Sequence, residues 1–104
     1  YGAALELVET HEYEGYTWTP EALPVALARE AWQRLGREPE FRPTGGGSDA
    51  SVFNARGIPT VVLSCGYLDA HTTHERVSLA DLVAGAEWAV EIVRVAAQGA
   101  GQAQ

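Results

Sequence analysis

Two stretches of the chain repeat apolar residues at the spacing of an amphipathic helix. The first stretch has apolar residues three or four positions apart, namely Val25, Ala28, Trp32 and Leu35. Gly36 is placed to end this helix. The sequence allows two starting positions for this helix. Thr19-Pro20-Glu21 has the cap, proline and acid of a first turn, whereas Pro24 favours a start a few residues later.

The second stretch follows Ser78, which with Asp81 forms a variant of the capping box. Its apolar face is the clearest in the sequence and comprises Leu79, Leu82, Val83, Ala86, Val90 and Val93. This spacing is typical of an amphipathic helix. Residues 98–104 contain only Gly, Ala and Gln, so they are expected to form a flexible tail.

A short helix is predicted between these two, over residues 48–56. Ser48 or Asp49 is placed to cap its start, and Gly57 is placed to end it. Val52 and Phe53 are its apolar residues, and we expect both to be buried.

Two further stretches have the character of β-strands. Ala3 to Tyr13 approximates the alternation of a half-exposed strand, and Ile58 to Leu63 is a continuous β-branched and apolar run. A strand of the second kind is covered on both faces by helices, which predicts an α/β fold. The first strand has no hairpin partner, so its neighbours are expected in a segment outside these residues. Cys65, at the end of the second strand, is expected to be a small core residue.

Composition excludes several classes of function. The formal net charge is −7, the pI is near 4.8, and the seven Lys and Arg residues are scattered singly, which disfavours nucleic acid as a partner. No apolar run approaches the roughly 18 residues of a membrane span. The single cysteine excludes an internal disulfide and slightly favours the cytoplasm. Because the chain has no methionine, we expect it to be part of a longer translation product.

A run of three glycines, residues 45–47, leads into the predicted short helix. Successive backbone N–H groups at a helix start can hold a carboxylate, a phosphate or an oxyanion, although such a run can equally be a flexible turn. The run lacks the Lys of a phosphate-binding P-loop. Ser48, Asp49 and His71 suggest a serine hydrolase, but the Gly-x-Ser-x-Gly elbow is absent and helix capping explains the first two residues.

A polar loop after the apolar strand carries His71, His74 and Glu75. One histidine at the end of a strand can be a single zinc ligand, with a carboxylate or carbonyl orienting its second nitrogen. The alternative is an exposed polar loop without a ligand. No other cluster supplies the remaining ligands, so any metal would be shared with residues outside the chain.

Taken together, several motifs resemble those of a known enzyme family. They are Tyr13-Glu14-Gly15-Tyr16, Gly46-Gly47-Ser48-Asp49-Ala50, Asn54-Ala55-Arg56-Gly57-Ile58-Pro59-Thr60-Val61, Gly66, and His71-Thr72-Thr73 with Glu75. The chain is similar, over about residues 1–97, to the C-terminal part of the co-catalytic zinc peptidases. This family includes tripeptide aminopeptidase (peptidase T), glutamate carboxypeptidase, aminoacylase and succinyl-diaminopimelate desuccinylase, and the peptidase T-like branch is the nearest.

The resemblance implies an architecture. Family members have an α/β/α sandwich catalytic domain with two zinc ions, interrupted by an α+β lid domain that often mediates dimerisation. Residues 1–19 would then be the last strand of the lid and its return, residues 20–97 the closing portion of the catalytic sandwich, and residues 98–104 a flexible tail. A homodimer through the lid is implied in the same way.

The resemblance also implies site residues. His71 matches the family's C-terminal zinc-ligand histidine, and Glu75 matches an acid that supports its loop. The loop that approaches the substrate is matched by Gly46, Gly47 and Ser48. Asp49 is expected to anchor that loop.

The family's other metal ligands and its general-base glutamate would lie before Tyr1. We therefore expect a C-terminal fragment of a zinc-dependent aminopeptidase, or of a related amidohydrolase acting on an N-acyl amino acid, that is inactive alone and completed by the remainder of its polypeptide. No catalytic residue is expected within the chain itself. The alternative is a small non-catalytic α/β module that binds an anionic ligand at the glycine loop.

Overall fold

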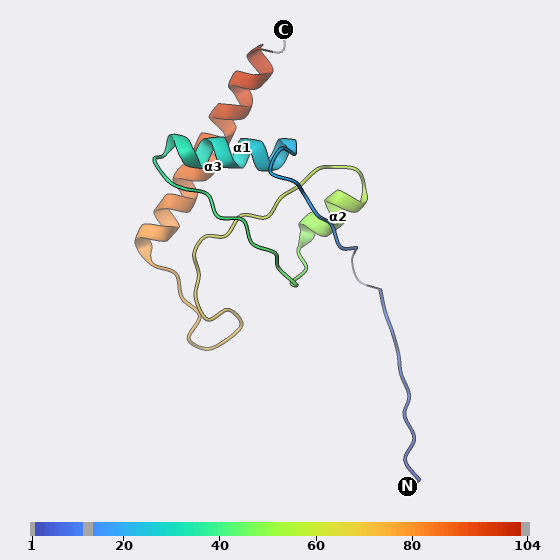
Figure 1. Cartoon of the computed structure of the whole chain (residues 1–104). Coiled ribbons are helices and arrows are strands. Elements are labelled where there is room, and N and C mark those ends of the chain that lie inside the picture. Colours follow the sequence, from blue (N-terminus) through green and yellow to red (C-terminus); the bar gives the residue numbers. More distant parts are fainter. Residues whose placement is uncertain (1, 12–13, 103–104) are drawn as a thin grey trace.

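Three helices, joined by long extended segments, form the secondary structure in the computed structural model, which describes residues 2–11 and 14–102. The helices are α1 (Leu23–Arg34), α2 (Asp49–Ala55) and α3 (Leu79–Gln102). As Figure 1 shows, α1 and α3 cross each other while α2 lies apart, and α2 contacts neither of them within the described ranges. No helix in the described part combines the length and the apolar composition needed to cross a membrane.

Local signals define the ends of the helices, as the sequence predicts. Gly36 and Gly57 both adopt positive φ, at 77° and 82°, directly after α1 and α2. At each of these two ends a backbone N–H donates to the carbonyl oxygen five residues earlier. At the end of α1 this bond runs from the Arg37 N–H to Trp32 O, at 3.2 Å. The side chain of Ser78 accepts a bond from the Asp81 N–H at 3.0 Å, which caps α3.

The start of α1 is the later of the two expected places. The helix begins at Leu23 with Pro24 in its first turn, and Ala22 before it provides no side-chain cap. Thr19 instead accepts a turn hydrogen bond from the Ala22 N–H at 3.1 Å. Pro24 sets this boundary because its ring lacks a donor and fits only the first turn.

Packing between α1 and α3 forms the centre of the molecule. Trp32 of α1 and Trp88 of α3 stack with ring centroids 4.4 Å apart at a tilt of 40°. The Trp88 indole N–H donates to Ala28 O at 2.8 Å, joining the helices across 60 residues of sequence. Small side chains permit this approach, because Ala31 is fully buried and Ala28 and Ala84 are nearly so.

The buried faces differ from those expected. Val52 and Phe53 of α2 are each 46% exposed, and the buried residues of that helix are Ala50 and Ser51. On α3 the predicted face remains exposed, whereas Ala84 and Val95 are buried. For α2 the expectation was wrong, because the sequence shows apolar residues without showing which neighbour covers them. Residues 98–102, expected to be a flexible tail, continue α3.

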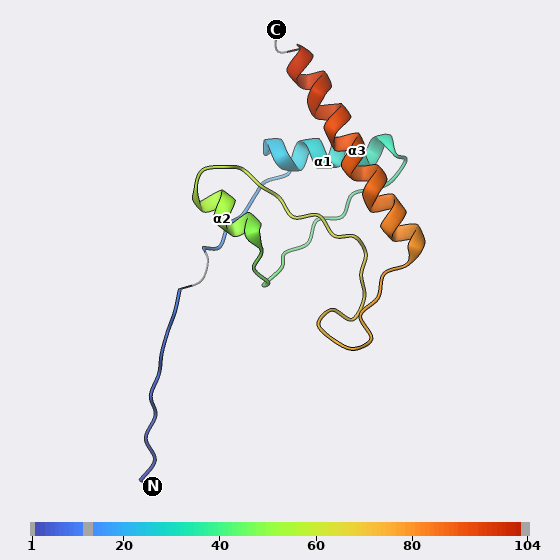
Figure 2. The same ribbon diagram turned by 180° about the vertical axis from the view of Figure 1, so that it is seen from behind.

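The predicted strands are absent from the described residues, whose only β-type pairing is an antiparallel bridge between Leu68 and Arg76. The run from Ile58 to Leu63 is extended but unpaired, so the predicted α/β layering is not seen. Residues 2–11 form an exposed arm (Figures 1 and 2), and Tyr13 lies outside the described residues. A strand needs hydrogen bonds from a neighbouring strand, and no described residue pairs with these two segments in that way. Cys65 is exposed for the same reason, contrary to the core position expected.

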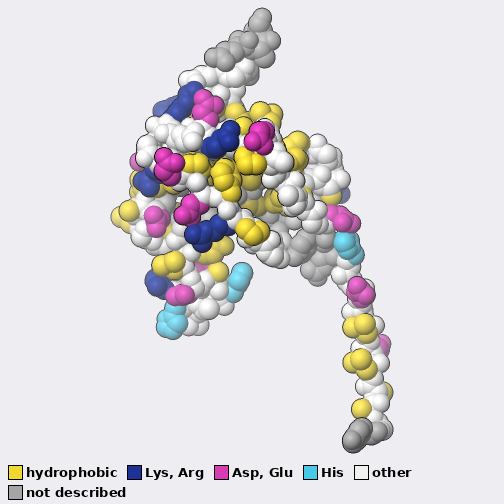
Figure 3. All heavy atoms as spheres, viewed as in Figure 1, with side chains coloured by type: hydrophobic (Ala, Val, Ile, Leu, Met, Phe, Trp, Pro, Cys, Tyr) yellow, Lys and Arg dark blue, Asp and Glu magenta, His cyan; other side chains and the backbone are white. Residues whose placement is uncertain are grey.

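The molecule is more extended than a self-contained domain of its length. Its radius of gyration is 18.2 Å, against about 13 Å for a compact domain of this size. Figure 3 shows hydrophobic side chains along the N-terminal arm as well as over the body. No large side chain is fully buried among the described residues.

Candidate functional site

The glycine loop leads directly into α2, as the sequence predicts. Ser48 has an extended backbone, and its hydroxyl accepts a hydrogen bond from the Ala50 N–H at 3.2 Å. Before it, the Gly46 N–H donates to the Thr44 hydroxyl at 3.2 Å. The hydroxyl of Ser48 is therefore used as a helix cap and makes no hydrogen bond with His71, which leaves the serine-hydrolase alternative without support. Asp49 is exposed in the first turn of α2, where a negative charge suits the helix dipole.

One residue anchors the extended segment that links the two loops. The Asn54 amide and the Thr60 backbone form two hydrogen bonds: Nδ2 donates to Thr60 O at 2.9 Å, and the Thr60 N–H donates to Oδ1 at 2.8 Å. The Trp18 indole N–H donates to the same carbonyl at 2.9 Å. These contacts tie the end of α2 and the linker before α1 to the start of the apolar run.

The loop of residues 68–76, called the histidine loop below, is closed at its base by the bridge between Leu68 and Arg76. Each of the two backbones donates to the other, at 2.7 Å and 3.1 Å. The Arg76 guanidinium also forms an ion pair with the Asp69 carboxylate and donates to His74 O at 3.1 Å. Arg76 therefore joins the start, the middle and the end of this loop.

Thr72 organises the inside of the loop. Its hydroxyl donates to Asp69 O at 2.7 Å and accepts from the His74 N–H at 3.1 Å. The Glu75 N–H donates to Thr72 O at 3.2 Å. The loop is thus held by hydrogen bonds among its own residues.

His71 stands at the tip of this loop in an uncommon conformation. Its φ is 63° and that of Asp69 is 54°, and no other non-glycine residue in the described part has a positive φ. Both are exposed, and Figure 3 shows histidine side chains at the surface of this loop. Glu75 is exposed and makes no side-chain bond to His71 among the described residues, so its supporting role stays a prediction.

The described residues do not by themselves form a metal centre. No group of three or more His, Cys, Asp or Glu side chains within ranges 2–11 and 14–102 is arranged to hold a metal ion. His71 presents an exposed imidazole that makes no hydrogen bond or ion pair with another described residue, which fits one ligand and no more.

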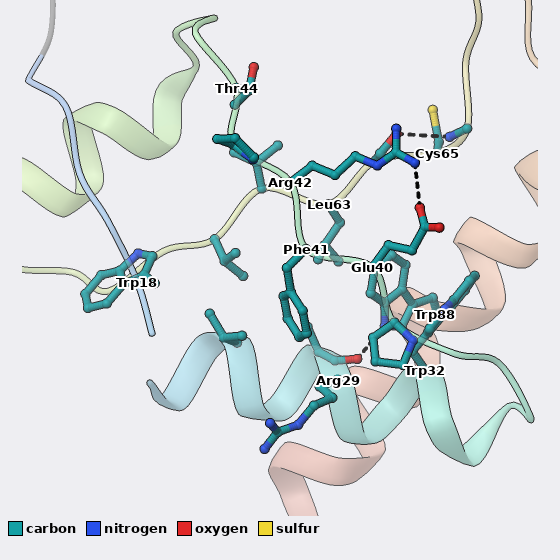
Figure 4. A pocket seen from close by; sticks show the side chains of 18 of the residues that line it. Trp18, Arg29, Trp32, Glu40, Phe41, Arg42, Thr44, Leu63, Cys65 and Trp88 are labelled. Atoms are coloured by element: carbon teal, nitrogen blue, oxygen red, sulfur yellow. Dashed lines mark hydrogen bonds and ion pairs between the residues drawn. The ribbon is translucent and has the colours of Figure 1, made fainter. Parts of the chain in front are cut away.

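A hollow of about 1140 Å³ is lined by α1, α3, the linker before α1 and the extended segments on either side of α2. Figure 4 shows Phe41 directed toward α1 and Arg42 paired with Glu40 at its edge. Gly45 and Gly46 reach its lining, whereas Gly47, Ser48 and His71 do not. The structure therefore does not bring the glycine loop and His71 together in one pocket.

Reasoning from the sequence missed Asp69, Thr72 and Arg76, which hold the histidine loop. One signal was available, because Asp and Thr three residues apart in a polar stretch are typical of a turn closed by side-chain hydrogen bonds. The pairing of Arg76 with Asp69 has no such signal, since it depends on the bridge that brings the two ends of the loop together.

Comparison with known proteins gives consistent results. Residues 4–95 match the model of the peptidase family M20/M25/M40. Protein YqjE of Bacillus subtilis (strain 168) is 40% identical over 86 residues, which are 83% of this chain and 23% of YqjE. Peptidase T of Geobacillus kaustophilus (strain HTA426) is 38% identical over 76 residues, 73% of this chain and 18% of that protein.

A solved structure matches the fold as well. The crystal structure of aminopeptidase PepT from Bacillus cereus ATCC 10987 superposes with a TM-score of 0.78 at 39% sequence identity. The match covers 82% of this chain and 23% of the PepT chain. The chain thus spans less than a quarter of the length of each of these relatives.

Proposed function

Because this chain belongs to the peptidase family M20/M25/M40, we propose that it is the C-terminal part of a zinc-dependent aminopeptidase or related amidohydrolase. The observation that carries the proposal is the match of 39% identity and TM-score 0.78 to an aminopeptidase structure, of which the chain covers 23%. The substrate class is a di- or tripeptide, with an N-acyl amino acid as the related option. The similarity to peptidase T supports the first of these.

The roles of this chain's own residues follow from the two loops. His71 supplies one imidazole ligand from a loop held in shape by Thr72 and Arg76. Zinc, when bound, activates a water molecule for attack on the substrate carbonyl. The glycine loop holds a substrate carboxylate or carbonyl oxygen through Gly46, Gly47 and Ser48. Asp49 and Glu75 support these loops, and the general base and the other ligands come from outside the 104 residues.

The same proposal assigns an architecture to the complete protein. Residues 20–97 close an α/β/α sandwich in which the extended run from Ile58 to Leu63 becomes a paired strand. Residues 1–19 form the last strand of a lid domain through which two copies dimerise. The exposure of Ile58 at 55% and Val62 at 48% supports this, because both are apolar side chains that a sheet would cover. The location proposed for the activity is the cytoplasm, as expected from the single cysteine.

Two observations weigh against the alternative of a small anion-binding module. Such a module would fold on its own at this length, but the radius of gyration of 18.2 Å is well above the value of about 13 Å for a compact domain. Helix α2, at whose start the anion would bind, has only seven residues and contacts neither of the other helices in the described part.

The decisive experiment compares His71→Ala with His74→Ala in the complete polypeptide. The two histidines lie on the same exposed loop, so His74→Ala controls for the loss of an imidazole from that loop. We expect His71→Ala to lose zinc, measured by elemental analysis, and to lower hydrolysis of a tripeptide by about 100-fold or more.

The control His74→Ala is expected to keep its zinc and its activity. Full retention of both by His71→Ala would overturn the assigned role of His71. Equal losses in the two variants would show that the loop matters only for its conformation, and would overturn that role as well.

A further inference from the structure

Helix α3 is apolar on two opposite sides, and α1 covers only one of them. The covered side carries Ala84, Trp88 and Val95, of which Ala84 and Val95 are 4% exposed. The other side carries the outer stripe, defined by Leu79, Leu82, Val83, Ala86, Val90 and Val93. Its large side chains are 47–76% exposed. Figure 2 shows the reason, because α3 lies in front of α1 there and no other segment lies in front of α3.

Three of the four charged residues of α3 lie on a narrow part of its circumference. At about 100° per residue, Glu87, Glu91 and Arg94 fall within an arc of about 60°. Asp81 is the helix's other charged residue and lies in the first turn. The apolar residues of the covered side and of the outer stripe lie on the rest of the circumference. A helix with this distribution is typical of the interior of a larger domain, where it is covered on several sides.

The spacing of the outer stripe indicates what kind of element covers it. Apart from Leu82, its residues follow one another at intervals of four and three, the pattern that packs against a second helix at a small crossing angle. From Leu79 to Val93 the stripe is about 21 Å long at 1.5 Å per residue. This length matches contact with a helix of about four turns.

We propose that the outer stripe of α3 is the docking surface for a further helix of the same peptidase polypeptide. The matched region makes up 23% of YqjE and 23% of the PepT chain, so a family member of ordinary length has ample chain to supply that helix. The proposal rests on the family and on the polypeptide being longer than these residues. It does not depend on the zinc-ligand role of His71.

A second copy of this chain fits the observations less well. Ile58, Val62 and Leu63 lie on a different segment from the outer stripe and are also 38–55% exposed. In a two-fold dimer formed through the outer stripe, each copy would cover the outer stripe of the other. The segment that carries Ile58, Val62 and Leu63 would stay uncovered. The remainder of a family-length chain can cover both.

Site-directed thiol labelling tests the proposal in the complete polypeptide. Single cysteines are introduced by Val90→Cys or Ala86→Cys on the outer stripe and by Arg94→Cys on the charged arc, with Cys65 and any other cysteine replaced by Ser. We expect both stripe thiols to react with a maleimide about tenfold or more slowly than the Arg94→Cys thiol, because a docked helix protects them. In urea all three are expected to react alike.

Each other outcome argues against the proposal. Stripe thiols that react as fast as the Arg94→Cys thiol, in protein whose thermal unfolding is unchanged, would show an uncovered surface. Protection that disappears on dilution together with a fall in mass by light scattering would show that a second copy is the occupant. Ala86→Cys is a small change. If Val90→Cys alone misfolds, the Ala86→Cys thiol still decides the test. The His71 experiment is read independently of all three outcomes.

Discussion

Gly66 shows how a single residue fixes the path from the extended run to the histidine loop. Its φ is +80°, a conformation that side chains with a Cβ disfavour. A Cβ at this position would lie 3.1 Å from Asp81 Oδ2 and 3.3 Å from Asp81 Cβ, in the first turn of α3. Glycine is therefore needed here for both its conformation and its lack of a side chain.

We predict that Gly66→Ala lowers the stability of the complete protein by about 1–2 kcal/mol, since the backbone is strained and Asp81 has to move. Gly15→Ala is the matched control, because no atom lies within 4 Å of its Cβ position and its φ is not positive. Differential scanning calorimetry of both variants measures the difference. Equal melting temperatures for the two would show that the turn at Gly66 rearranges without cost.

The conformation of the histidine loop marks the limit of prediction for single residues. Spacing and resemblance indicate that His71 is a zinc ligand. This remains a prediction that the His71→Ala experiment tests. The φ of 63° at His71 and the bonds from Thr72 and Arg76 come instead from closure of the loop. That closure depends on the pairing of Leu68 with Arg76, two residues that no local pattern identifies as partners.

At the scale of elements, the contact between α1 and α3 depends on Trp88. Its ring stacks on Trp32, and its indole N–H reaches the carbonyl of Ala28. We predict that Trp88→Phe destabilises the protein by about 1–2 kcal/mol, because the hydrogen bond and part of the buried ring are lost. The expected result is a melting temperature a few degrees lower.

Tyr67→Phe is the control for that substitution. It also removes a polar group from an aromatic ring, but Tyr67 is 50% exposed and its hydroxyl makes no hydrogen bond within the described residues. We expect no change in melting temperature. A Trp88→Phe protein as stable as this control would mean that the helices are held by their alanine contacts alone.

The helices were predictable from the sequence and the strands were not, for a physical reason. The ends of α2 and the C-terminal end of α1 are set by residues within a few positions, such as Ser48 and Gly36, so a local pattern is enough. Ile58 to Leu63 has the composition of a strand, but pairing needs a neighbour that the described residues do not supply. The same holds for the outer stripe of α3, whose apolar spacing was visible although its neighbour was not.

At the scale of the whole molecule, apolar surface is distributed over every segment. Leu5 and Leu7 on the N-terminal arm are 92% and 80% exposed, Phe41 is 57% exposed, and Leu79 is 76% exposed. A chain that buries so few large side chains gains little hydrophobic stabilisation to offset its loss of conformational entropy. This exposure supports the proposal that residues 1–104 belong to a longer polypeptide.

This argument predicts the behaviour of residues 1–104 produced alone. The isolated chain is expected to bind the dye ANS, to lack a cooperative thermal transition, and to elute from size-exclusion chromatography as an expanded or aggregated species. The complete polypeptide at the same molar concentration is expected to show none of these properties. A monomeric isolated chain with a cooperative melt and a radius of gyration near 13 Å, measured by small-angle X-ray scattering, would instead support the self-contained module.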